Sequence, residues 1–142
     1  MNWRRYFLAL GATGVVTLVA DVVLNAIVFR DVYRRSASFL LPAQELNSRV
    51  WLGWASLILI VAAFGFLLVR GGWLGFRRAL HFGLVLAVAG VAGVVGIASV
   101  VAWPSELLVA VAVQQFINGL LLGVVFGVVY RPAGDVPLSV ES

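Results

Sequence analysis

Residues 10–29, LGATGVVTLVADVVLNAIVF, are long and apolar enough to cross a bilayer, yet they carry polar residues at one regular spacing. This polar stripe recurs every four residues and consists of Thr13, Thr17, Asp21 and Asn25. An α-helix has about 3.6 residues per turn, so the spacing predicts that these side chains share one slowly drifting face. A carboxylate at membrane depth is costly unless it faces a partner or water. The stripe therefore predicts that other helices of the chain pack against Asp21.

The composition places the chain outside the range of soluble domains. Its 142 residues are 63% hydrophobic and 11% charged, with a mean hydropathy of +1.07, whereas about a quarter of the residues in soluble domains are charged. The net charge of +4 would suggest nucleic acid in a soluble protein. Here the arginines lie at the ends of apolar runs, where they anchor helices to membrane lipids. We therefore expect an integral membrane protein with no nucleic-acid partner.

Four apolar runs each approach the roughly 20 residues that span a bilayer. They cover residues 6–29, 50–69, 79–102 and 107–130. We expect an all-α fold, an integral membrane four-helix transmembrane bundle occupying residues 1–130. The second run is made mostly of Leu, Ile, Val and Phe, has Ser56 as its one Ser or Thr, and is expected to face lipid. Residues 30–49 are expected to form a loop with amphipathic turns, and the polar tail at residues 131–142 to be solvated unless a partner holds it.

The arginine distribution predicts the orientation of this bundle. Six arginines fall on the side shared by the two termini and the second loop, and four fall on the other side. The first set is Arg4, Arg5, Arg70, Arg77, Arg78 and Arg131, and the second is Arg30, Arg34, Arg35 and Arg49. Because cytoplasmic segments carry an excess of basic residues, we expect both termini in the cytoplasm.

The fourth run supplies the expected partner of the polar stripe. Its glycines form a face of the glycine-zipper type that lets another helix approach closely. They follow Gln115 every four residues and are Gly119, Gly123 and Gly127. The first and fourth runs are antiparallel, so Asp21 and Gln115 are expected at similar depth, about 5 Å from the midplane. The resulting polar cluster is Asp21, Asn25, Gln114, Gln115 and Asn118.

Two interpretations of this cluster stay open. Interhelical hydrogen bonds of this kind fix helix register and are worth about 0.6 kcal/mol each on average. Intramembrane carboxylates also mark proton, cation or substrate sites, which would make Asp21 functional. The third run adds Gly90, Gly93 and Gly96, which suit close packing within the bundle or between subunits.

The remaining candidate binding residues are basic. His81 is the only histidine, and it is expected at the membrane interface, with axial ligation of haem or a pigment as the alternative. No spacing typical of metal ligands occurs, so we expect no metal and no cofactor. Arg30, Arg34 and Arg35 are expected to anchor the interface, with contacts to lipid headgroups as the more specific interpretation. The chain has no cysteine, which excludes a thiolate nucleophile and quinone-coupled thiol chemistry.

The second half of the chain carries a resemblance. GFRRALHFGLVLAVAG at residues 75–90 and VFGVVYRP at residues 125–132 resemble a loose class of small bacterial four-helix membrane proteins. The resemblance implies a bundle in the bacterial inner membrane and implies no activity. Small multidrug transporters are similar in one respect, an acidic residue in the first of four helices.

These features favour a non-enzymatic accessory or structural subunit of a larger membrane protein complex, since no pair of reactive side chains stands at catalytic spacing. Its partners would be membrane lipids and other membrane subunits, or further copies of the chain. The alternative is a small oligomeric transporter or channel that uses Asp21. An enzyme acting on lipid or quinone, and a pigment or cofactor carrier using His81, are less favoured.

Overall fold

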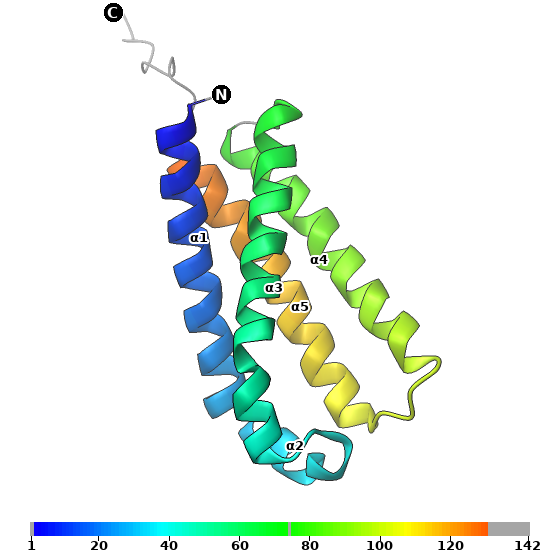
Figure 1. Cartoon of the computed structure of the whole chain (residues 1–142). Helices are drawn as coiled ribbons and strands as arrows, with labels where there is room; N and C mark the ends of the chain where they lie inside the picture. The colour runs from blue at the N-terminus through cyan, green and yellow to red at the C-terminus, as the bar shows by residue number, and fades with distance from the viewer. Residues whose placement is uncertain (1, 74, 131–142) are drawn as a thin grey trace, which may run out of the picture.

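All secondary structure in the computed structural model, which describes residues 2–73 and 75–130, is helical (Figure 1). The elements are α1 (Trp3–Val23), the π-helical turn η1 (Leu24–Val28), α2 (Arg30–Arg35), the 3-10 turn η2 (Ala37–Phe39), α3 (Ala43–Arg70), α4 (Phe76–Ala98) and α5 (Ser105–Val129). Four segments are long and apolar enough to cross a membrane: Trp3–Val28, Gln44–Arg70, Phe76–Ala98 and Ser105–Val129. This confirms the predicted all-α fold with four such helices. The predicted tail, with Arg131, lies outside the described residues.

The segment predicted as a loop is largely helical. α2 and η2 occupy its first part, and α3 begins at Ala43, immediately after Pro42, instead of near residue 50. Pro42 is the N-cap residue, with an extended ψ of 145°, and no side chain caps the first turn of α3. An ion pair between Glu45 and Arg49, 2.6 Å apart and one turn from each other, lies in this early part of α3. Residues 44–49 are mostly polar, so the apolar pattern of the sequence did not predict that the helix includes them.

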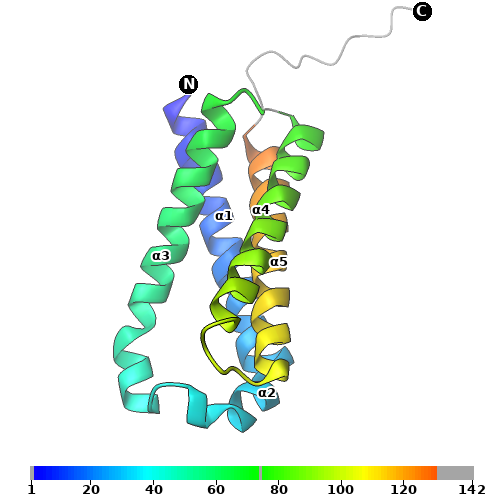
Figure 2. The same cartoon turned by 90° about the vertical axis from the view of Figure 1, so that its right-hand side faces the viewer.

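α5 is the central helix of the bundle. It packs most closely against α4, with which it forms an antiparallel hairpin, and it also packs along α1. α3 packs mainly against α1 and hardly touches α5. Figure 2 shows α3 diverging from the other three long helices toward the end that holds α2.

The end of the bundle near the N-terminus is closed by an apolar core. Its buried residues are Tyr6, Ala9, Leu68, Val69, Ala79, Phe126 and Tyr130, drawn from all four long helices and the residue that follows α5. The Tyr6 hydroxyl donates a 2.7 Å hydrogen bond to the Ala62 carbonyl and so ties α1 to α3. The closed end therefore fixes α3 at its second half, while most side chains in the first half of α3 remain exposed.

Glycines on α5 make the α4–α5 hairpin tight. A Cβ built on Gly123 would lie 2.5 Å from the Ala79 carbonyl oxygen and 2.8 Å from the Gly83 Cα, so no larger residue fits. Gly119 and Gly127 meet Ala87 and Ala79 in the same way. The glycine face of α5 is thus used against α4, whereas the sequence pattern associated it with the polar stripe of α1.

The glycines of α4 divide into two groups, Gly83 and Gly90, which lie against α5, and Gly93 and Gly96, which do not. Gly90 lies beside Gln115, whose Cβ would be 3.2 Å from an added Cβ. Gly93 and Gly96 have nothing within 4 Å of an added Cβ and contribute no close contact in the described part of the chain.

Candidate functional site

The first two residues of the polar stripe of α1 are fully buried, and the third, Asp21, bonds α5. Thr13 and Thr17 are both 0% exposed, and the Thr17 hydroxyl donates to the Thr13 carbonyl oxygen at 2.8 Å. Such bonding to the preceding turn satisfies the hydroxyl within its own helix. Asp21 follows one turn later and is half-buried. The two threonines therefore pack the interface, and Asp21 is the first stripe residue whose side chain bonds another helix.

Asp21 is held by two amides of α5. Gln114 Nε2 and Asn118 Nδ2 each donate a 2.9 Å hydrogen bond to Asp21 Oδ1. The two donors lie four residues apart, so they project from adjacent turns of one face. Neither ion pair found in residues 2–73 and 75–130 includes Asp21. Within the described residues, the Asp21 carboxylate is therefore stabilised by hydrogen bonds from two side-chain amides and not by an ion pair.

Gln115, the expected partner of Asp21, lies elsewhere. Its side chain packs over Gly90 of α4, and it is exposed. Adjacent residues of a helix point in different directions, so only one of Gln114 and Gln115 can face α1. The structure selects Gln114, which leaves the Gln115 amide on the side of α5 that faces α3 and α4.

Tyr33 extends the polar cluster to α2. Its hydroxyl donates to Gln114 Oε1 at 3.2 Å, so hydrogen bonds run from Tyr33 through Gln114 to Asp21. Burial raises the pKa of Tyr33, and the negative charge of Asp21 raises it further. This role of Tyr33 was not predictable from the sequence, because Tyr33 resembles the other interfacial aromatic residues and lies 81 residues from Gln114.

Asn25, the last residue of the stripe, makes no hydrogen bond to Asp21. It lies in η1, where the Phe29 amide bonds the Leu24 carbonyl at 2.7 Å across a wide π-type turn. Its Oδ1 is buried and has no hydrogen-bond partner within the described chain. Single π turns occur frequently at functional sites. Asn25 is therefore separated from the cluster and faces the α2 end of the bundle.

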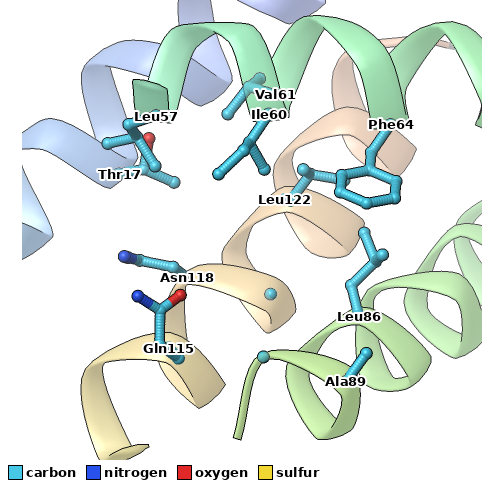
Figure 3. A pocket seen from close by; sticks show the side chains of 12 residues that line it. Thr17, Leu57, Ile60, Val61, Phe64, Leu86, Ala89, Gln115, Asn118 and Leu122 are labelled. Carbon is cyan, nitrogen blue, oxygen red and sulfur yellow. The ribbon is translucent and has the colours of Figure 1, made fainter. Parts of the chain in front are cut away.

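A cavity of about 270 Å³, here named the side crevice, lies where α3 diverges from α4 and α5 (Figure 3). Its wall is mostly apolar and includes Leu57, Ile60, Phe64 and Leu86. Its polar lining consists of Thr17, Gln115 and Asn118. Asn118 Oδ1 is buried without a partner among the described residues. Asn118 therefore bonds Asp21 through its Nδ2 and also lines the side crevice.

The basic candidates are distributed over two ends of the bundle. His81 is exposed, and its Nδ1 lies 2.7 Å from the Arg77 carbonyl oxygen. Across the described part of the chain, no three His, Cys, Asp or Glu residues lie close enough to hold a metal ion. Arg35 pairs with Glu106 at 2.7 Å, with both side chains largely exposed. Arg30 and Arg34 instead line a separate shallow pocket.

Comparison with known proteins found no match to a protein family, to a curated protein or to a solved structure. The fold and the site define the class of protein as an all-helical chain with four helices of membrane-spanning length and apolarity. Within that class, its particular features are the amide-held Asp21 and the neighbouring side crevice.

Proposed function

We propose that the protein is a non-enzymatic accessory subunit of a larger complex in the bacterial inner membrane, with both termini in the cytoplasm. The observation that carries the subunit role is the amide of Gln115, which lines the apolar side crevice and makes no side-chain hydrogen bond within residues 2–73 and 75–130. Polar groups are costly in a bilayer unless another group pairs with them. A polar side chain from another membrane-embedded protein would supply that pairing.

The dimensions of the side crevice support a side chain as its occupant. A volume of about 270 Å³ has room for one or two large side chains and none for a whole helix. Gly93 lies one turn along α4 from Ala89, which lines the side crevice, and an added Cβ at Gly93 would meet nothing within 4 Å among the described residues. Small residues let a second helix approach closely. A partner helix along this side would therefore present its side chains to Gln115 and Asn118.

The arginines support the proposed orientation. Among the described residues, five lie at the end of the bundle near the N-terminus and four lie at the α2 end. The set near the N-terminus is Arg4, Arg5, Arg70, Arg77 and Arg78. The excess is small, but it has the sign expected for cytoplasmic termini.

Site-specific photocrosslinking in native membranes tests the subunit proposal. A photoreactive phenylalanine analogue at Ala89, which lines the side crevice, is compared with the same analogue at Val88, which is exposed but does not line it. We expect Ala89 to trap one other chain in high yield and Val88 to trap little of it. The same chain should co-purify with the wild-type protein, and Gln115→Ala should reduce both capture and co-purification.

The opposite result would refute this proposal. If the gently solubilised native particle holds only copies of this chain, or if capture at Ala89 does not depend on Gln115, the accessory role fails.

A small oligomeric transporter or channel is the second candidate, favoured by the state of Asp21. Its half-buried carboxylate pairs with no cation in the described residues, and its amide partners lead to Tyr33 on one side and to the side crevice on the other. Such a chain of polar groups is the type of arrangement that proton or cation pathways use. Purified protein in sealed vesicles should then give a proton or cation flux that Asp21→Asn abolishes, while its melting temperature stays unchanged.

A further inference from the structure

Two arginines of α2 form no ion pair with the part of the chain that the structure describes. Arg30 and Arg34 lie four residues apart and therefore on one face of this short helix. No carboxylate of the described chain lies within ion-pair distance of either one, whereas Arg35, on the same helix, is paired with Glu106 at 2.7 Å. Asp31, also on α2, is exposed, and the arginines outnumber it, so this helix has a net positive charge that favours an anionic ligand.

The pocket beside these arginines has an apolar part and a polar part. Its volume is about 350 Å³, and it is lined by Arg30 and Arg34 together with the apolar Leu40, Leu41 and Leu46. We name it the α2 pocket. Asn25, whose Oδ1 is buried and unpaired within the described residues, lines the same pocket. The α2 pocket thus offers cationic donors and an apolar surface within one site.

We propose that the α2 pocket binds an anionic phospholipid, with its phosphate on Arg30 and Arg34 and the start of an acyl chain over Leu40, Leu41 and Leu46. Guanidinium groups match phosphate oxygens with two parallel hydrogen bonds, which makes arginine well suited to this role. A free phosphate would use the arginines but would leave the leucines uncovered.

The bound lipid also stabilises the contact between α2 and α5. Tyr33 lines the α2 pocket, and its hydroxyl bonds Gln114 of α5. A lipid that contacts both arginines holds α2 in the position that makes this bond. The proposal rests on the proposed membrane location and adds to it a defined ligand and a defined site.

The test uses the purified full chain in a neutral detergent, with native mass spectrometry and thermal melting as readouts. Phosphatidylglycerol, phosphatidylcholine and inorganic phosphate are added separately. We expect phosphatidylglycerol to bind and to raise the melting temperature, and the other two to do neither. The double variant Arg30→Gln, Arg34→Gln should lose affinity for phosphatidylglycerol by about thirtyfold, the loss expected for two arginine contacts with an anionic lipid.

Arg35→Gln is the matched control, because it removes a charge from the same helix that Glu106 already neutralises. It should bind phosphatidylglycerol as the wild type does. The melting temperature of each variant without lipid shows whether it is folded, and the single variant Arg34→Gln replaces the double variant if the latter is not. Equal losses in the double variant and in Arg35→Gln would overturn the proposal, because the effect would then be general charge attraction. Equal stabilisation by phosphate and by the lipid would overturn the acyl-chain part.

Membrane location is tested separately. If alkaline carbonate releases the wild-type protein from cell membranes, the membrane proposal fails, whatever the lipid measurements show.

Discussion

Asn118 donates a 2.9 Å hydrogen bond to the carboxylate of Asp21, although 97 residues separate the two in the chain. Gln114, one turn earlier on α5, donates to the same oxygen at the same distance. Two donors on one helix and one acceptor on another fix the register of α1 against α5, since a shift by one residue would break both bonds. The same register determines that Gln115 faces the side crevice.

Replacement of Asp21 separates its hydrogen bonding from its charge. Asp21→Asn keeps a carbonyl oxygen for Gln114 and Asn118 and should melt close to the wild type. Asp21→Leu leaves both amides unpaired and should lose about 1–3 kcal/mol of stability. Thermal melting of the three proteins in one detergent provides the comparison. Equal melting of wild type and Asp21→Leu would mean that the contact between α1 and α5 does not stabilise the fold.

Two glycines should respond differently to the same substitution. Gly123→Leu forces a side chain against the Ala79 carbonyl oxygen and the Gly83 Cα, so it should cost about 1–3 kcal/mol or more. Gly93→Leu meets nothing within 4 Å and should leave the melting temperature nearly unchanged. If the exposed α4 surface binds the proposed partner, Gly93→Leu should still reduce co-purification. Equal destabilisation by both substitutions would contradict the observed α4–α5 packing.

Tyr33 should make stability depend on alkaline pH. Its pKa in the folded chain is raised above the ordinary value of 10.0 by burial and by Asp21. As the pH rises above 10, Tyr33 loses its proton in the unfolded chain before it does so in the folded chain. The stability contributed by the neutral hydroxyl is therefore fully present below pH 10 and is lost as the pH rises through the raised pKa of the folded chain. Wild type should therefore be more stable than Tyr33→Phe at neutral pH, by about 0.5–1.5 kcal/mol, and the difference should shrink above pH 10. A constant difference across that range would show that Tyr33 is not buried against Gln114.

Single cysteines test the proposed orientation in intact cells. Ser38→Cys lies at the exposed α2 end of the bundle, and Ser139→Cys lies in the tail, outside the described residues. An impermeant maleimide should label the first and not the second, because the termini are proposed to be cytoplasmic. Labelling of Ser139→Cys alone would reverse the orientation, and both sites should react after the membrane is permeabilised.

The number and type of helices were predictable from the sequence, because the apolar runs exceed the length needed for a bilayer and contain few charges. The period of the polar stripe similarly predicted a shared face for Thr13, Thr17 and Asp21, since helix geometry is a local property. The start of α3 was not predictable from hydropathy, because residues 43–49 are polar and form a helix through backbone bonding and the Glu45–Arg49 pair.

The choice of partners depended on the tertiary structure. Gln114 and Gln115 are chemically identical neighbours, and only the rotation of α5 about its axis decides which of them reaches Asp21. That rotation is set by the close approach of Gly119 and Gly123 to α4, a contact between surfaces far apart in the sequence. The periodicity of the sequence therefore determined which residues share a helix face, because helix geometry depends only on neighbouring residues. What each face contacts was decided by packing between helices, because the direction in which a face points depends on residues far away in the sequence.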